Sequence, residues 1–230
     1  MKFPRVIAHR GACAYAPENT MASFQKAFDL GATWIETDVM LTQDLVPVLN
    51  HDDSLKRTIG VDVLVANCPC TELDRYTFKG EHIPHLDTLL AFLMKNNMGF
   101  NLELKPTVRM EKDTARIAMQ SVIDTGFPKD RLLITSFSMV ALEAAYAHAP
   151  HYHYGWLSDN DHNMQLGLAS KVPFVTMNIN QERASRALVA ELNANGYQVL
   201  CFTVNDPKRA KELFDMGVTA VFSDKPDLLS

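Results

Sequence analysis

The chain has 230 residues, of which 47% are hydrophobic and 21% are charged, proportions that are typical of a soluble globular protein. Its formal net charge of −5, without any cluster of Lys and Arg, excludes a surface that coats nucleic acid. The longest apolar runs fall short of the roughly 18 residues that indicate a membrane-spanning helix, and the stretch before His9 is too short for a secretory signal. We therefore expect a cytoplasmic protein with no nucleic-acid partner and no stable membrane association.

Short β-branched or aromatic runs alternate with amphipathic stretches along the whole chain. The predicted strands are Val6–His9, Trp34–Val39, Phe100–Lys105, Leu132–Ser136, Tyr152–Trp156, Phe174–Asn178, Gln198–Thr203 and Ala220–Ser223. The predicted helices include Thr20–Leu30, Glu111–Asp124, Met139–His148, Glu182–Asn193 and Pro207–Met216. Eight strands that alternate with helices predict parallel units that close into a (β/α)8 TIM barrel. A doubly wound open sheet is the alternative, and the absence of a G-x-G-x-x-G turn after the first strand disfavours it.

The interval between Met40 and Leu86 breaks this alternation, because no regular helix is predicted in it. It contains the short strand-like run Val46–Leu49, which is followed by a mostly polar excursion. Such a long interruption inside a compact domain usually carries function. We predict a single barrel domain over residues 1–230, in which residues 46–85 form a hairpin and a small cap over the mouth of the barrel.

Charged side chains recur on one face of two predicted strands. Because side chains alternate along a strand, Glu36 and Asp38 share a face and lie roughly 6–7 Å apart. Glu103 and Lys105 share a face of the next barrel strand in the same way. Charges on a buried strand are costly unless they are paired or bind a metal. Three carboxylates without a thiolate suit Mg²⁺ or Ca²⁺ better than zinc, and a buried ion-pair network, such as Lys105 with Glu36, is the alternative.

Two histidines follow strand-like runs beside these carboxylates. His9 closes the first strand, and His51 follows the run Val46–Leu49. A lone histidine is more often structural than catalytic, but a pair beside a carboxylate cluster suits proton transfer near neutral pH. Arg10 offers a planar donor, and Lys105 a point charge, to a phosphate group.

A series of short polar motifs extends over essentially the whole chain, and its joint spacing is highly specific. The motifs are His9-Arg10-Gly11, Pro17-Glu18-Asn19-Thr20, Glu36-x-Asp38, Thr42-x-Asp44, His51-Asp52, Ile83-Pro84, Glu103-x-Lys105, Ser136-Phe137, Thr203-Val204-Asn205 and Ser223-Asp224-Lys225-Pro226. This series closely resembles the glycerophosphodiester phosphodiesterase family, in its small cytosolic bacterial type.

The resemblance implies a TIM-barrel enzyme that hydrolyses small-molecule glycerophosphodiesters to sn-glycerol 3-phosphate and an alcohol. It implies one divalent cation, Mg²⁺ or Ca²⁺, and two histidines that act as general acid and base. The implied site residues are the metal ligands Glu36, Asp38 and Glu103, the acid–base pair His9 and His51, and the substrate-binding residues Arg10, Lys105 and Phe202. In such a site the glycerol 2-hydroxyl would attack phosphorus, and water would then open the cyclic phosphate.

Three positions depart from the family pattern. Leu45 replaces glycine in the turn before Val46–Leu49, and because leucine tolerates positive φ poorly, we expect a different turn type there. Phe202 replaces a tryptophan beside the glycerol, and His85 replaces a small residue, which would alter the cap and the leaving-group pocket.

Other polar residues carry weaker expectations. We expect Asn19 or Thr20 to cap the first helix, and Glu18 is a candidate for supporting the site. Cys68 and Cys70 lack the two-residue gap of a redox or zinc pair, and we expect all four cysteines to be reduced structural thiols. Pro84 prevents a regular helix that would present His82 and His85 as a metal pair.

Two further functions stay open from the sequence. One is a lysophospholipase D-like lipid phosphodiesterase, which the lack of an amphipathic membrane helix disfavours. The other is a non-catalytic phosphodiester-binding barrel, which would need neither both histidines nor all three carboxylates. The sequence does not determine an oligomeric state.

Overall fold

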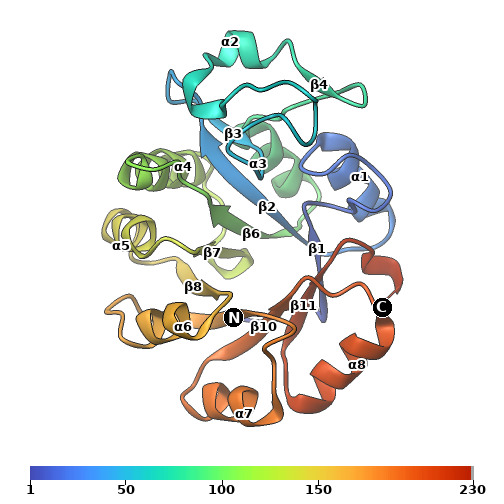
Figure 1. Cartoon of the computed structure of the whole chain (residues 1–230), viewed down its shortest axis with the longest axis vertical. Coiled ribbons are helices and arrows are strands. Elements are labelled where there is room, and N and C mark those ends of the chain that lie inside the picture. Colours follow the sequence, from blue (N-terminus) through green and yellow to red (C-terminus); the bar gives the residue numbers. More distant parts are fainter. Residues whose placement is uncertain (229–230) are drawn as a thin grey trace.

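Eight parallel strands close into a ring in the part of the chain that the computed structural model describes, residues 1–228 (Figure 1). They are β1 (Val6–His9), β2 (Trp34–Leu41), β6 (Gly99–Leu104), β7 (Leu132–Ser136), β8 (His153–Ser158), β9 (Phe174–Asn180), β10 (Gln198–Phe202) and β11 (Ala220–Ser223). Neighbours pair in the order β1-β11-β10-β9-β8-β7-β6-β2, and β1 also pairs with β2, which closes the ring. The predicted TIM barrel is confirmed, and the open-sheet alternative is wrong.

Helices surround the ring of strands in Figure 1. They are α1 (Met21–Asp29), α3 (Leu86–Lys95), α4 (Glu111–Thr125), α5 (Met139–His148), α6 (Asp161–Leu168), α7 (Arg186–Ala194) and α8 (Pro207–Met216), and the 3-10 turns η2 (Lys129–Arg131) and η3 (Pro226–Leu228) lie before β7 and after β11. Within residues 1–228, none of the helices is both long and apolar enough to cross a membrane. Helix α7 begins later than its predicted start at Glu182, because the Ser185 side chain caps it by accepting the Leu188 N–H.

The strand register brings the predicted site residues to one level of the barrel. His9 pairs with Glu36 across β1 and β2, and Asp38 pairs with Glu103 across β2 and β6. His9 ends β1, Glu103 lies one residue before the end of β6, and the pairing brings Glu36 and Asp38 of the longer β2 to the same level. This is the face where TIM barrels build active sites. The alternation of side chains that predicted this convergence is therefore present in the structure.

Apolar packing fills the opposite end of the barrel. A cluster that includes Ile7, Trp34, Leu133, Leu200 and Phe222 lies among the strands, and the Phe3 ring packs edge-on against Trp34 at 5.1 Å. A second, larger core lies between the strands and the surrounding helices. These apolar side chains pack in the barrel interior and extend to Phe222, which also lines the cavity at the carboxyl ends of the strands.

The interval between β2 and α3 forms its own small hydrophobic cluster at the top of Figure 1. It contains β3 (Pro47–Leu49), η1 (Val65–Asn67), α2 (Cys70–Leu73), β4 (Thr77–Phe78) and β5 (Glu81–His82), and β3 pairs antiparallel with β2. The expectation that this interval holds no regular helix is wrong, because α2 forms one helical turn in it. A helix of four residues is too short to leave a periodic apolar pattern in the sequence. We interpret residues 46–85 as a cap on the barrel.

The turn between β2 and β3 places Leu45 at φ 65°, so the expectation of a different turn type is wrong. A non-glycine residue in this region costs roughly 1 kcal/mol, and side-chain hydrogen bonds hold the turn. The Thr42 hydroxyl donates to Asp44 Oδ1 at 2.7 Å and accepts from the Val46 N–H at 2.9 Å. Asp44 Oδ1 also accepts the Cys70 N–H at 2.9 Å, which ties the turn to the cap.

Candidate active site

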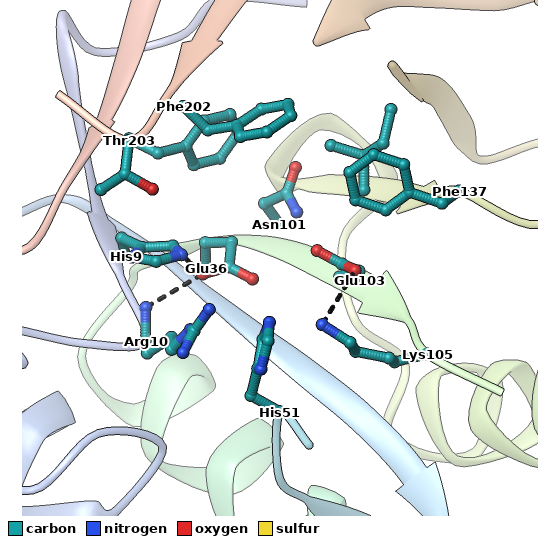
Figure 2. A pocket seen from close by; sticks show the side chains of 12 residues that line it. His9, Arg10, Glu36, His51, Asn101, Glu103, Lys105, Phe137, Phe202 and Thr203 are labelled. Atoms are coloured by element: carbon teal, nitrogen blue, oxygen red, sulfur yellow. Dashed lines mark hydrogen bonds and ion pairs between the residues drawn. The ribbon is translucent and has the colours of Figure 1, made fainter. Parts of the chain in front are cut away.

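A cavity of about 200 Å³ opens at the carboxyl ends of the strands (Figure 2). Its lining residues are His9, Arg10, Glu36, His51, Asn101, Glu103, Lys105, Phe137, Leu157, Phe202, Thr203 and Phe222. Seven of the eight predicted site residues are among them. The eighth, Asp38, is buried beside the cavity, with its carboxylate in ion pairs with Arg10 and Lys105.

The three predicted metal ligands converge in the structure. One carboxylate oxygen from each of Glu36, Asp38 and Glu103 lies within 4.8 Å of the other two. Burial and the charges of the neighbouring carboxylates raise the pKa of Glu36 well above its usual value, and burial and Asp38 raise the pKa of Glu103 to about 8. Crowding of like charges in a buried site is relieved when a cation binds. The residues present therefore fit a divalent cation with oxygen ligands.

Two basic side chains offset part of the carboxylate charge. Lys105 Nζ lies 3.5 Å from Asp38 Oδ1 and 3.9 Å from Glu103 Oε1, and Arg10 Nε lies 3.6 Å from Asp38 Oδ2. Burial raises the pKa of Asp38, but these two cations outweigh it and leave the pKa below its usual value. When all three carboxylates are ionised, the two cations leave one negative charge in excess, so these ion pairs alone do not balance the ionised cluster. The predicted pair of Lys105 with Glu36 is not among the ion pairs of residues 1–228.

Asn19 orients the central carboxylate. Its Nδ2 donates to Asp38 Oδ2 at 2.9 Å, and its Oδ1 accepts the Thr37 hydroxyl at 2.6 Å. Asn19 is buried and has φ 54°, whereas Thr20 caps α1 by accepting the Ser23 N–H. Of the two expected caps, Thr20 is therefore the cap, and Asn19 positions Asp38.

The turn after β1 delivers both a backbone donor and a side chain to the cavity. Arg10 has φ 51° and Gly11 has φ 78°, and the Arg10 N–H donates to Glu36 Oε2 at 2.9 Å. A Cβ atom on Gly11 would lie 2.7 Å from the backbone carbonyl carbon of Ser23. Glycine is therefore required at this position both for the backbone conformation and for the close approach of α1.

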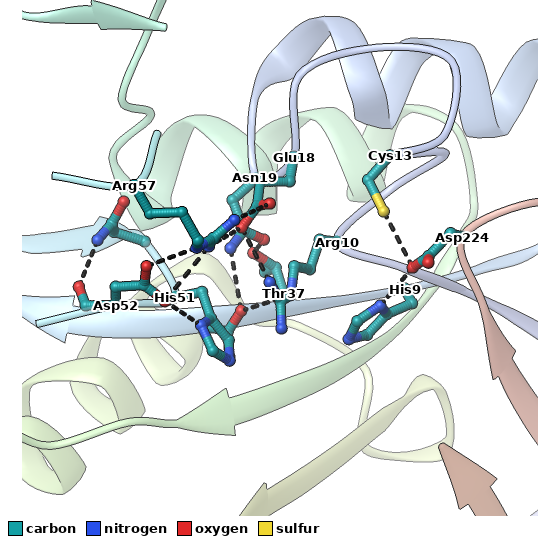
Figure 3. Close-up of polar contacts among 12 residues, drawn as sticks. His9, Arg10, Cys13, Glu18, Asn19, Thr37, His51, Asp52, Arg57 and Asp224 are labelled. Carbon is teal, nitrogen blue, oxygen red and sulfur yellow. Dashed lines mark hydrogen bonds and ion pairs between the residues drawn. The ribbon is translucent and has the colours of Figure 1, made fainter. Parts of the chain in front are cut away.

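A carboxylate from the far end of the chain holds His9 (Figure 3). His9 Nδ1 lies 2.7 Å from Asp224 Oδ1, and Asn205 Nδ2 donates to Asp224 Oδ2 at 2.6 Å. Burial raises the pKa of Asp224, but hydrogen bonds from His9 and Cys13 outweigh it, so the pKa lies far below its usual value. With Nδ1 committed to Asp224, Nε2 is the His9 nitrogen on the side of Glu36, at 4.0 Å from Oε2. The sequence motifs contain Asp224 and Asn205, but no role was predicted for either.

The other histidine is held by a network that joins the cap to the barrel (Figure 3). His51 Nδ1 lies 2.5 Å from Asp52 Oδ1, and Arg57 donates to Asp52 Oδ2 at 2.6 Å. Arg57 also donates to both oxygens of Glu18, at 2.7 and 2.8 Å, and Glu18 accepts from Arg10 at 2.9 Å. Glu18 thus supports the site as a bridge between Arg10 and the cap. Arg57 was missed from the sequence, where it is one arginine in a polar stretch.

Aromatic rings form one wall of the cavity. The rings of Phe137 and Phe202 meet edge to face, with centroids 5.9 Å apart (Figure 2). Phe137 keeps 39% of its surface exposed. The wall is apolar and faces the charged residues across the cavity, so a ligand that fits here has one charged part and one apolar or uncharged part.

Comparison with known proteins matches residues 9–228 to the Glycerophosphoryl diester phosphodiesterase family. A glycerophosphodiester phosphodiesterase of Bacillus altitudinis is 31% identical over 97% of this chain and 95% of its own length. A glycerophosphodiester phosphodiesterase of Caldanaerobacter subterraneus subsp. tengcongensis is 28% identical over 97% of this chain and 95% of its own length. The solved structure of an Oleispira antarctica phosphodiesterase in complex with the product sn-glycerol-3-phosphate is also similar. It is 35% identical, covers 98% of this chain and 95% of its own, and has a TM-score of 0.92. The chain therefore belongs to the glycerophosphoryl diester phosphodiesterase family and is an enzyme of that family, as its motifs predicted.

Proposed function

We propose that this enzyme hydrolyses glycerophosphodiesters to sn-glycerol 3-phosphate and an alcohol, in a reaction that depends on a divalent cation. The observation that carries the proposal is the convergence of three carboxylates and two histidines on one cavity of about 200 Å³. The similar Oleispira phosphodiesterase, which holds sn-glycerol-3-phosphate, supports a substrate of this class. A cytoplasmic location stays a prediction from the sequence.

Glu36, Asp38 and Glu103 would hold the cation. All their donor atoms are oxygens, which favours Mg²⁺ or Ca²⁺ over metals that prefer nitrogen and sulfur. Such a cation, when bound, neutralises phosphate charge and acidifies a hydroxyl group. Asn19 and Arg10 fix the carboxylates in place through the hydrogen bonds to Asp38 and Glu36.

Arg10 and Lys105 would bind the phosphate. Arg10 Nε is buried and donates no hydrogen bond within residues 1–228, although a buried donor without an acceptor costs about 1–3 kcal/mol. A phosphate oxygen in the cavity would satisfy that donor, and Lys105 Nζ, which keeps part of its surface exposed, would add a point charge. Phe202 would pack against the glycerol carbons.

The two histidines differ in a way that suits base and acid. Burial lowers the pKa of His51 below 6.5, and the Arg10 charge lowers it further, although the Asp38 carboxylate opposes this shift. His51 is therefore neutral near pH 7 and able to accept a proton. His9 is held through Nδ1 by Asp224, which orients its ring and leaves Nε2 to give a proton to the leaving oxygen.

We infer that His51 removes the proton of the glycerol 2-hydroxyl as its oxygen attacks phosphorus. The bond from phosphorus to the leaving oxygen breaks, and His9 gives its proton to that oxygen, which releases the alcohol. In the second step His9 takes a proton from water, whose oxygen opens the cyclic phosphate, and His51 returns its proton to the 2-oxygen. Both histidines end in their starting states, so the cycle is balanced.

Removal of divalent cations is expected to stop the reaction. Release of glycerol 3-phosphate from glycerophosphocholine should fall to background in a chelator and return after dialysis against Mg²⁺ or Ca²⁺. Turnover that persists in the chelator would contradict the metal dependence. The proposed function would be contradicted if neither metal supports turnover of any of four substrates. These are glycerophosphocholine, glycerophosphoethanolamine, glycerophosphoinositol and glycerophosphoglycerol. Faster cleavage of lysophosphatidylcholine than of glycerophosphocholine would identify a lipid phosphodiesterase instead.

Asp224→Asn is expected to lower kcat about 10–100-fold with little change in KM. The amide keeps the shape of the carboxylate but no longer offers the charged acceptor that orients the His9 ring. The expected loss has the size seen when such supporting partners are removed. Steady-state kinetics against wild type check this. Asp227→Asn, three residues along the chain, is the matched control, and equal losses in both variants would show that the local turn rather than the His9 contact matters.

A further inference from the structure

A second cluster of metal-ligating side chains lies in the cap, where no catalytic role has been assigned. It consists of Cys70 at the start of α2, Asp74 at the end of that helical turn, and His85 directly before α3. One ligand atom from each lies within 4.8 Å of the other two. The cluster shares no residue with the active-site cavity.

The spacing of the three atoms matches one face of a metal tetrahedron. Zinc bonds of about 2.3 Å to sulfur and 2.0–2.2 Å to nitrogen and oxygen, set at tetrahedral angles, separate the ligand atoms by about 3.3–3.6 Å. His85 Nε2 lies 3.2 Å from both Cys70 Sγ and Asp74 Oδ1, and Cys70 Sγ lies 4.0 Å from Asp74 Oδ1. Adjustments of a few tenths of an ångström would therefore complete the coordination.

The same three residue types also occur in cysteine nucleophile triads, but the geometry here is different. In such a triad one imidazole nitrogen faces the nucleophile and the other faces the carboxylate. Here both the Cys70 sulfur and the Asp74 carboxylate face His85 Nε2. The sulfur, the imidazole nitrogen and the carboxylate oxygen therefore converge on one point, as the ligands of a cation do, and do not form the chain of a triad. A cation placed between the three atoms would bind all of them.

We infer that Cys70, Asp74 and His85 form a Zn²⁺ site, with a water molecule as the fourth ligand. Sulfur and imidazole ligands select zinc over the Mg²⁺ or Ca²⁺ expected at the barrel carboxylates. A thiolate and a carboxylate balance the charge of Zn²⁺. The side chains of Asp74 and His85 are 49% and 39% exposed, which leaves the ion a way in from solvent.

The bound ion would join three parts of the cap. The Cys70 N–H donates a hydrogen bond to Asp44 Oδ1 in the β2–β3 turn, and Asp74 lies directly after α2. His85 forms a β-bridge to Val48 in β3, the strand that leads to His51. Zinc would therefore fasten α2 to the strand that presents an active-site histidine, and stabilise the cap.

Cobalt substitution tests the site with a readout other than activity. Protein treated with a chelator is titrated with Co²⁺ in excess Mg²⁺, which occupies the barrel carboxylates. We expect one equivalent of Co²⁺ to give intense visible absorption of tetrahedral cobalt and a thiolate-to-cobalt charge-transfer band, and one equivalent of Zn²⁺ to remove both. Cys70→Ser should abolish the charge-transfer band, and His85→Ala should weaken Co²⁺ and Zn²⁺ binding at least about tenfold.

Two cysteine variants serve as matched controls. Cys13 lies beside His9 and Asp224 near the active site, and Cys68 is buried two residues before Cys70; Cys13→Ser and Cys68→Ser should both keep the band. Absence of the band in wild type, or its loss in Cys13→Ser together with its retention in Cys70→Ser, would overturn the assignment. If Cys70→Ser does not fold, His85→Ala and Asp74→Asn carry the test, since the His85 side chain makes no capping hydrogen bond to α3.

Discussion

His9→Ala and His51→Ala are each expected to lower kcat about 10²–10⁴-fold while the chain stays folded. Both side chains line the cavity and retain partial exposure, so their removal leaves no large hole in the core. Each loses one proton transfer of the proposed cycle, while the carboxylates and basic residues that bind cation and phosphate stay in place. KM is therefore expected to change much less than kcat.

Steady-state kinetics with glycerophosphocholine, together with thermal unfolding, check this expectation. His148→Ala is the matched control, because His148 is exposed on α5 and contacts only Gln120 in the side-chain hydrogen bonds of residues 1–228. Turnover of either active-site variant within threefold of wild type would contradict its role. An equal loss in His148→Ala would point to a general effect on folding.

Substrates with different leaving groups distinguish the general acid from the general base. A nitrophenol ester of glycerol 3-phosphate has a leaving oxygen that needs no proton, so the loss of a general acid costs little with this substrate. We expect His9→Ala to recover most of the rate of the first step on the nitrophenyl ester, measured as nitrophenol released in a single turnover, whereas His51→Ala should stay impaired in this step on both substrates. The reverse pattern would exchange the roles of the two histidines, and equal impairment of both variants on both substrates would contradict the division of roles.

The carboxylate cluster was predictable because it depends on local pattern. The period of two along a strand places Glu36 and Asp38 on one face, and the same rule places Glu103 beside Lys105. Parallel pairing of β2 with β6 then sets Asp38 opposite Glu103. Residue pattern alone left an ion-pair network open, and the motif series was needed to favour a metal site.

The supporting residues were not predictable because their partners are distant in sequence. Asp224 contacts His9 across 215 positions, and Arg57 contacts Glu18 across 39. No periodic pattern encodes such contacts, since they depend on how the ring of strands closes and how the cap folds back. The expectation for Leu45 was wrong for a different reason. Thr42 Oγ1 accepts the Val46 N–H and Asp44 Oδ1 accepts the Cys70 N–H, and these hydrogen bonds outweigh the conformational preference of a single residue.

Glu103→Gln is expected to make the metal-free protein more stable while it lowers turnover at least about 100-fold. Burial and the Asp38 charge raise the pKa of Glu103 from 4.5 to about 8, so the folded chain holds a proton that the unfolded chain loses. Each pKa unit corresponds to about 1.4 kcal/mol, which gives an upper limit of about 3 kcal/mol of destabilisation in wild type near pH 7. Glutamine has the same shape and no charge, and it removes this destabilisation.

The pH dependence of unfolding gives the sign of the effect. Below pH 4.5 Glu103 is protonated in both states and the two proteins should be equally stable. As the pH rises the wild type loses stability relative to Glu103→Gln, and the difference is complete above about pH 8. Chemical unfolding in a chelator from pH 4 to 8 measures it, with Glu143→Gln, an exposed position on α5, as the control.

Added Mg²⁺ or Ca²⁺ should reverse this order of stability. The cation stabilises only the folded state that binds it. At concentrations above the dissociation constant, the free energy of unfolding rises with the logarithm of the cation concentration. Wild type should gain stability on titration, and Glu103→Gln should gain much less, because one of three ligands is lost. A variant that is less stable than wild type in the chelator, or that gains as much from the cation, would show that Glu103 serves as a structural ion-pair partner of Lys105. A variant that is more stable than wild type in the chelator and gains less from the cation would have a different meaning. It would mean that the buried carboxylates destabilise the metal-free barrel because they are arranged to bind a cation.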